Sequence, residues 1–184
     1  MDLKSIMSKD CRVIIDTCSM MNSQFEEAFE KMIPVLQESG NKLIVPQSCI
    51  EELTKHAKST IISRSIKAAS ALTILQKNQE FISIKGDPTD GDFADPVFHR
   101  ICNQFKIKYY LIVITEDKKL TEDLLNINHQ RSVRGHKVEV VNIGYIANYR
   151  GKKNRRQPFS IQTKVSEKSD TIININDVPK EGDK

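Results

Sequence analysis

The sequence predicts an α/β fold in which helices cover both faces of a central, mainly parallel sheet, that is, a three-layer α/β/α sandwich. Strand-like and helix-like segments alternate along the chain, as is typical of parallel strands joined by helical crossovers. The strongest strand signal, YYLIVI at 109–114, is almost entirely apolar, as expected of a strand covered on both faces. With 184 residues, the chain is long enough for one such domain with a complete core.

Short apolar runs bounded by charged or turn residues predict five strands. They span 11–16, 42–45, 81–84, 109–114 and 137–142. Apolar residues at helical spacing predict five helices. Four of them span 24–38, 60–79, 93–105 and 119–126. The remaining one, the second along the chain, begins at a cap on Ser48 and runs through Ala57. Gly40 ends the first helix, and Pro96 lies in the first turn of the fourth, where proline is tolerated.

The composition changes near residue 150, which divides the chain into a predicted domain at 1–149 and a basic, polar tail or linker at 150–184. Of the net charge of +4, about +3 falls on residues 151–184. Five cations fall within seven residues, namely Arg150, Lys152, Lys153, Arg155 and Arg156. They are either a nucleic-acid contact or a solvated tail without a partner. The closing VPKEGDK suggests the approach to an additional domain.

Composition and cysteine usage argue against several classes of protein. No apolar run approaches the roughly 18 residues of a membrane span, and MDLKSIMSKDC at the amino end has no apolar signal core. We therefore expect a cytoplasmic protein that does not contact a membrane. The four cysteines form no CxxC pair and the histidines lack metal-ligand spacing, so we expect reduced, structural thiols and no zinc site. They are Cys11, Cys18, Cys49 and Cys102.

Acidic residues recur where the predicted strands end and on the helices that follow. They are Asp16, Glu51, Glu52, Asp92, Asp95, Glu116 and Asp117. In a parallel sheet covered by helices, ligands bind beyond the carboxyl ends of the strands. Carboxylates gathered there repel one another unless a cation intervenes, and Mg²⁺ or Mn²⁺ prefers such oxygen ligands. A metal of this kind activates water and polarises phosphoryl groups, so the pattern points to phosphodiester hydrolysis.

Each acid also has a structural interpretation that stays open. Asp16 and Asp117 can be the N-caps of the helices that follow them. Glu52 can be a solvated helix residue, with Glu51 as the alternative ligand, and Asp95 can be an acid favoured by the helix dipole. Asp92, three residues before Asp95, is either an extra ligand or a turn residue. Four groups near these acids also have two interpretations: they contact phosphate, or they are ordinary solvated or packed side chains. They are His99, Arg100, Lys118 and Lys119.

Four stretches in this order resemble the PIN-domain ribonucleases. They are VIIDTCSMM, IVPQSCIEELTKH, GDFADPVFHRIC and LIVITEDKKLTEDL, and the resemblance spans about residues 11–145. Carried over, the family's four acids fall on Asp16, Glu52, Asp95 and Asp117, with Thr17 and Thr115 as supporting hydroxyl groups. The resemblance implies a PIN-like fold and a metal-dependent endonuclease that cuts single-stranded RNA with Mg²⁺ or Mn²⁺ and without a protein nucleophile.

Other nucleotide-handling classes lack their motifs. The chain has no GxxxxGK[ST] and no GxGxxG after its first strand, and Cys18 stands where an aspartyl phosphatase carries its second aspartate. A PIN-like module that binds RNA or a protein without cutting is the alternative function. The sequence leaves open whether the chain forms a homodimer and whether it binds an inhibitor protein. It also does not decide between a toxin, an RNA-processing and an RNA-decay role.

Overall fold

The structure of the chain is a computed structural model that describes Leu3, Met7 and residues 10–86, 94–129 and 135–149. Five strands form one sheet in the order β3-β2-β1-β4-β5, and every neighbouring pair is parallel. The strands are β1 (Cys11–Ile15), β2 (Leu43–Pro46), β3 (Ile82–Lys85), β4 (Tyr110–Ile114) and β5 (Val138–Val141). Each strand matches a predicted one within one residue at either end, so the predicted parallel sheet is confirmed.

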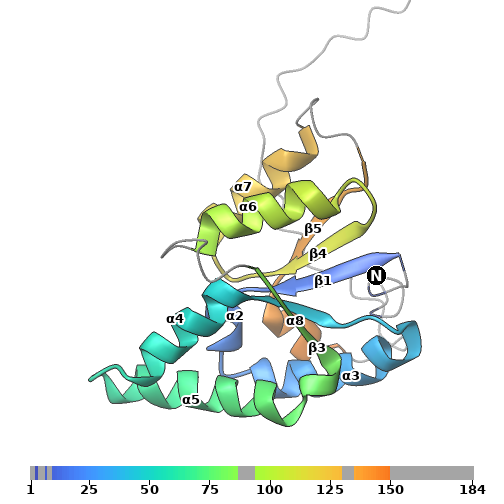
Figure 1. Ribbon diagram of the computed structural model, residues 1–184. Coiled ribbons are helices and arrows are strands. Elements are labelled where there is room, and N and C mark those ends of the chain that lie inside the picture. The colour runs from blue at the N-terminus through green and yellow to red at the C-terminus, as the bar shows by residue number, and fades with distance from the viewer. Residues whose placement is uncertain (1–2, 4–6, 8–9, 87–93, 130–134, 150–184) are drawn as a thin grey trace, which may run out of the picture.

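Helices cover both faces of this sheet (Figure 1). They are α2 (Thr17–Met20), α3 (Phe25–Ser39), α4 (Gln47–Ala57), α5 (Ile62–Lys77), α6 (Ala94–Phe105), α7 (Lys118–Asn126) and α8 (Ile143–Ala147), with 3-10 turns η1 (Gln79–Phe81) and η2 (Ile127–His129). Helices α3, α5 and α8 lie on one side of the sheet, and α6 and α7 lie on the other. The result is an α/β protein with three layers, as predicted.

The order of the strands reverses direction beside β1. The chain runs outward from β1 through β2 to β3, returns to place β4 on the other side of β1, and continues to β5. The carboxyl ends of β1 and β4 therefore meet at the topological switch point, where sheets of this type bind ligands. The side chains of both strands are buried from Val13 to Ile15 and from Leu111 to Ile114, so this point rests on the centre of the core.

Some local predictions were wrong or incomplete. Ser48 is not the cap of α4, because Pro46 occupies that position and Ser48 lies inside the helix with no hydrogen-bond partner for its hydroxyl among the described residues. The short helices α2 and α8 were not predicted, since four or five residues are too few to display a helical period.

Cys18 is exposed, whereas the other three cysteines are buried, and all four are free thiols.

Several residues singled out from the sequence lie outside the described part of the chain. These are Asp92, the cations of 150–156 and the whole tail at 150–184, together with the side chain of Asp95, whose backbone lies in the first turn of α6. Within the described ranges, no helix combines the length and the apolar character needed to cross a membrane.

Of the three glycines with a positive φ among the described residues, Gly40 and Gly135 differ in what a side chain would meet. Gly40 ends α3 in the left-handed conformation with φ of 69°, and a Cβ there would meet nothing within 4 Å. Gly135 has φ of 154°, and a Cβ there would lie 2.3 Å from the backbone oxygen of Lys106, which accepts a hydrogen bond from the amide of His136. A residue with a Cβ would therefore strain only the backbone conformation at position 40. At position 135 it would strain the backbone and also clash with the backbone of Lys106.

We expect Gly40→Ala to lower the free energy of unfolding by about 1 kcal/mol, and Gly135→Ala to lower it by at least about 2 kcal/mol. Urea unfolding of both variants measures the difference. Gly40→Asn is the matched control, because asparagine tolerates the left-handed conformation better than alanine. Equal losses for the two alanine variants would contradict the clash at Gly135.

Candidate active site

The candidate site begins with Asp16, the first residue after β1. Its amide donates to the backbone oxygen of Ile114 at 3.1 Å, which continues the β1–β4 ladder and places it beside Thr115. Only 5% of Asp16 is exposed. No lysine, arginine or histidine of the described residues forms an ion pair with this carboxylate. A buried carboxylate without a cation is costly, so its hydrogen bonds decide how it is held.

Three donors surround the Asp16 carboxylate. Oδ1 accepts from the amide of Ser19 at 2.8 Å, so Asp16 is the N-cap of α2. Oδ2 accepts from the thiol of Cys18 at 2.8 Å and from the hydroxyl of Thr115. The cap interpretation of Asp16 is therefore correct, and it uses one oxygen while the other faces the end of β4.

Thr115 connects Asp16 to the acid that follows β4. Its Oγ1 donates to Asp16 and accepts from the amide of Asp117 at 3.0 Å. Asp117 Oδ1 in turn accepts from the amide of Leu120 at 3.0 Å, which makes Asp117 the N-cap of α7. Both the predicted supporting role of Thr115 and the cap interpretation of Asp117 agree with this geometry.

Glu52 reaches the same place from α4. Its Oε2 accepts from Thr17 Oγ1 at 2.6 Å, and its Oε1 lies 3.5 Å from His56 Nε2. Glu51 instead accepts from Gln47 Nε2 at 3.2 Å on its own helix. The structure thus brings Glu52, and not Glu51, to the end of β1, although 44% of the Glu52 side chain is exposed.

Two thiols, those of Cys18 and Cys49, lie beside these acids, and burial raises the pKa of both. Burial raises the pKa of Cys49 to about 12, and the charges of Asp16 and Glu52 add to the increase. The Cys18 residue is exposed as a whole, but partial burial of its sulfur is the largest cause of a raised pKa, followed by the charge and the hydrogen bond of Asp16, and this pKa also rises to about 12. Both thiols are therefore protonated at neutral pH, and both experience the field of Asp16.

Other residues named from the sequence lie further from this cluster or face elsewhere. Glu116 accepts from the amide of Ile143 at 2.8 Å and so supports the start of α8. His99 Nε2 lies 3.9 Å from Asp123 Oδ2, which joins α6 to α7 and favours the packing interpretation of this histidine. Lys118 and Lys119 are exposed in the first turn of α7, immediately after Asp117.

The donor set fits a hard divalent cation in part. Asp16, Glu52 and Asp117 supply carboxylate oxygens at one end of the sheet, and no described residue contacts the second oxygen of Asp117. Within the described residues, however, no three acidic, histidine or cysteine side chains gather closely enough to hold an ion. The described residues alone therefore do not form a complete metal centre.

His56 and the thiol of Cys18 were not recognised as parts of the site. The spacing of four residues between Glu52 and His56 on a helix places both on one face and is the signal that could have indicated the contact. The hydrogen bond from Cys18 to Asp16 depends on the unpredicted turn of α2 and has no such signal in the sequence.

Fold and site together define an α/β protein whose described strands form one all-parallel sheet, with Asp16 and Asp117 at the topological switch point and Glu52 beside it on α4. We call Asp16, Glu52 and Asp117 the acidic cluster. No model of a protein family matches the chain, and no curated protein matches it either.

Replacement of Thr115 by valine keeps the side-chain shape but removes the hydroxyl that serves both acids. We expect the free energy of unfolding to fall by about 1–3 kcal/mol, because a buried acceptor and a backbone donor lose their partners. Thermal or urea unfolding measures the loss. Thr73→Val on the exposed side of α5, where the hydroxyl bonds only to the oxygen of Ala69, is the matched control. An unchanged stability of Thr115→Val would show that the hydroxyl is dispensable.

The raised pKa of Cys18 predicts slow alkylation of the metal-free protein. Because the pKa of Cys18 is about 12, its thiolate fraction at pH 8 is far smaller than that of an ordinary cysteine. The thiolate fraction rises as the pH approaches 12. We expect iodoacetamide to label Cys18 at least about tenfold more slowly than a model thiol. Asp16→Asn removes the neighbouring charge, lowers the pKa and should accelerate labelling. Mass spectrometry of the intact protein in EDTA follows the reaction, with Cys18→Ser as the control for the buried thiols. Equal rates with and without the Asp16 charge would be inconsistent with this assignment.

Proposed function

We propose that the chain is a metal-dependent endoribonuclease of the PIN class that hydrolyses phosphodiester bonds of single-stranded RNA. The observation that carries the proposal is the Asp16 carboxylate, which is 5% exposed at the switch point and has no cationic partner among the described residues. Buried charge is retained in a fold when something compensates for it, and a divalent cation is the compensation that oxygen donors favour.

The residues that would hold Mg²⁺ or Mn²⁺ are Asp16, Glu52, Asp95 and Asp117. When bound, such an ion supplies a more acidic water and stabilises charge on a phosphate. The protein's own contribution is orientation. Thr17 holds one oxygen of Glu52, and Thr115 holds one oxygen of Asp16 while fixing the backbone of Asp117. Because Asp16 and Thr115 directly follow the central strands β1 and β4, the Asp16 carboxylate and the backbone of Asp117 are held in defined positions.

Water, and not a side chain, is the nucleophile in this proposal. The nearest thiols belong to Cys18 and Cys49, and each has a pKa of about 12, so neither is a thiolate at neutral pH. The hydroxyls of Thr17 and Thr115 are engaged as hydrogen-bond donors to the carboxylates of Glu52 and Asp16. The basic segment at 150–156 would help to hold RNA through its phosphates.

A catalytically silent PIN-like module that binds RNA or a protein is the second candidate. The observation in its favour is that Asp16 and Asp117 are both helix N-caps, a structural role that needs no metal. The two candidates differ in one property, which is turnover of RNA that a chelator abolishes.

Asp16→Asn removes the charge of this residue and keeps the oxygen that caps α2, while its amide nitrogen takes the place of the oxygen that accepts from Cys18 and Thr115. Asparagine is as good an N-cap as aspartate, so the start of α2 is kept while the negative charge is lost. We expect the wild-type protein to cut labelled single-stranded RNA in Mn²⁺ or Mg²⁺ and not in EDTA, and Asp16→Asn to lose at least about 100-fold in rate. Gel analysis of the products measures the rate, and circular dichroism checks the fold.

Glu30→Gln, at an exposed position on α3, is the control for loss of one negative charge and should cut at the wild-type rate. A fully active Asp16→Asn protein would defeat the assignment of Asp16. RNA binding by a folded wild-type protein without metal-dependent cleavage would favour the binding module.

A further inference from the structure

The two helices that follow β2 form a hairpin with a strong charge bias. From Leu53 to Gln79 the sequence contains no aspartate or glutamate, although 24 of the 184 residues are acidic. Five cations lie in the same stretch, namely Lys55, Lys58, Arg64, Lys67 and Lys77. We call α4, α5 and the turn between them the basic hairpin.

Three cations of the basic hairpin are available to a ligand. Lys58, Arg64 and Lys67 are exposed, and no carboxylate of the described residues pairs with any of them. Isolated cations on a surface are common, but three close in sequence with no compensating acid create a local positive potential.

The hairpin that carries these cations is held firmly. Leu53 on α4 and both Ala68 and Ala71 on α5 are buried between the helices and the core. Across the turn, the hydroxyl of Ser65 donates to the backbone oxygen of Ala57 at 2.6 Å. The cations therefore project from a defined platform, which lowers the entropic cost of binding an extended ligand.

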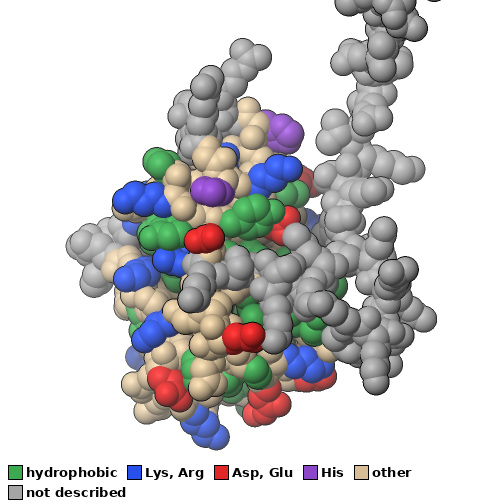
Figure 2. All heavy atoms as spheres, turned by 90° about the vertical axis from the view of Figure 1, so that its right-hand side faces the viewer, with side chains coloured by type: hydrophobic (Ala, Val, Ile, Leu, Met, Phe, Trp, Pro, Cys, Tyr) green, Lys and Arg blue, Asp and Glu red, His purple; other side chains and the backbone are tan. Residues whose placement is uncertain are grey.

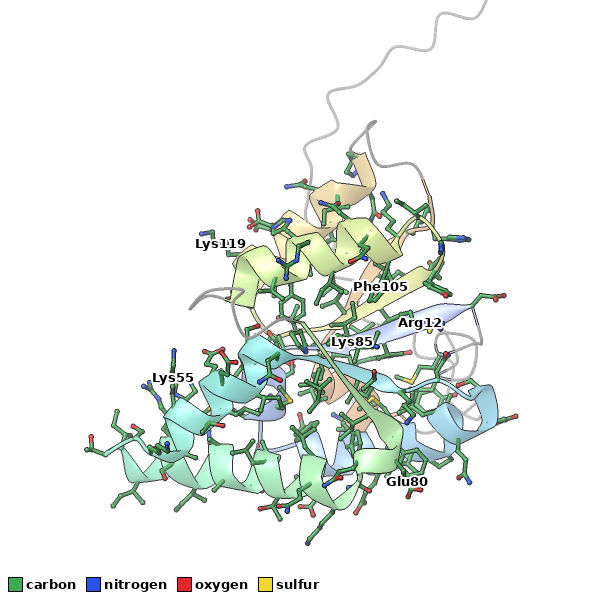
Figure 3. The ribbon with its side chains drawn as sticks, viewed as in Figure 1. Arg12, Lys55, Glu80, Lys85, Phe105 and Lys119 are labelled. Atoms are coloured by element: carbon green, nitrogen blue, oxygen red, sulfur yellow. The ribbon has the colours of Figure 1, made fainter. Side chains whose placement is uncertain are left out.

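The basic hairpin itself carries one member of the acidic cluster. Glu52, which contacts Thr17 beyond the end of β1, lies on α4 only a few residues before Lys58. Figure 3 shows Lys55 on α4 and Lys119 on α7 at the end of the molecule toward which β1 runs. The two lysines lie on opposite sides of β1 in this view. Cations thus flank the carboxylates from two elements.

The opposite end of the molecule has a different charge pattern. Figure 2 shows the side of the molecule where β1 begins, and lysine or arginine side chains are interspersed there with acidic ones. Three exposed lysines precede strands at that end, namely Lys42 before β2, Lys108 before β4 and Lys137 before β5. They supply a matched set of cations far from the candidate site.

We propose that the basic hairpin binds the phosphate backbone of single-stranded RNA through Lys58, Arg64 and Lys67 and leads it to the carboxylates. This inference rests on the proposed function, since it assigns the substrate-holding surface of the same site. A polyanion is repelled by an acidic cluster, so cations on the neighbouring hairpin offset that repulsion along the approach. The chain therefore holds RNA with described residues of the domain, in addition to any contact from 150–156.

An anionic membrane surface is the other class of ligand that such a hairpin could attract. Ile61, Ile62 and Ile66 are exposed near the turn, and Ile62 and Ile66, four residues apart, share one side of α5. Arg64 and Lys67, three residues apart, share a different side of the helix. RNA is favoured because the cations lie on the same hairpin as Glu52, whereas a membrane would use the isoleucines.

The test is RNA binding by the full chain in EDTA, where no metal-dependent cleavage occurs. Fluorescence anisotropy of a labelled single-stranded RNA is compared for wild type, Lys58→Glu/Arg64→Glu/Lys67→Glu and Lys42→Glu/Lys108→Glu/Lys137→Glu. The two triple variants change the net charge equally. We expect the hairpin variant to bind at least about tenfold more weakly than the control variant at moderate salt. The slope of log K against log salt should fall by about 2 in the hairpin variant, which corresponds to three lost phosphate contacts on a single strand.

Equal affinities of the two triple variants, or no binding by wild type, would overturn the inference whether or not the wild type cuts RNA. Sedimentation with phosphatidylserine vesicles gives a second result. Vesicle binding that is lost in Ile62→Ser/Ile66→Ser, with RNA binding unaffected by the hairpin cations, would assign the surface to a membrane instead. Weakened RNA binding in the hairpin variant, combined with a wild type that does not cut, would keep the inference and reject the nuclease. Circular dichroism confirms that each variant is folded.

Discussion

The hydrogen bond from Thr115 to Asp16 is the contact on which the rest of the site depends. It joins the ends of β1 and β4, the two central strands, and it places the backbone of Asp117 through the same hydroxyl. Without this donor, a carboxylate that is almost fully buried would face the end of the neighbouring strand with one fewer partner. The threonine therefore keeps an otherwise unfavourable charge in the centre of the fold, and the positions of two acids follow from it.

Helix capping and ion binding are compatible uses of these acids. A carboxylate has two oxygens, and a cap needs one of them. Asp117 gives Oδ1 to the amide of Leu120, and no described residue contacts its second oxygen. Asp16 is more fully used, since Oδ2 accepts from both Cys18 and Thr115. A cap of this kind also fixes the side-chain rotamer, so the oxygen that is left points in a defined direction.

The layered fold was predictable, because the apolar run of β4 and the alternation of strands with amphipathic helices are strong and redundant signals. The positions of Asp16 and Asp117 at one edge of the sheet were predictable for a related reason, since each follows a strand that ends at that edge. Glu52 lies on the helix after β2 and contacts Thr17, but the acids of the described residues do not gather closely enough to hold an ion. The order of the strands, the turn of α2 and the contact between Cys18 and Asp16 were not predictable, because they arise from pairing between distant segments and leave no local period. The displaced cap of α4 shows the same limit, as Ser48 satisfies the local preference and yet the chain turns into the helix at Pro46.

The separation of Asp16 and Thr115 by 99 positions has a consequence for synthesis of the protein. The early strands β1, β2 and β3 can pair as soon as they leave the ribosome, but β1 lacks its second neighbour until β4 has been made. Asp16 and Asp117 therefore share their common partner only after Thr115 has been made. A nascent chain that ends before Thr115 carries Asp16 without the hydroxyl that joins it to β4, although Glu52 can already accept from Thr17.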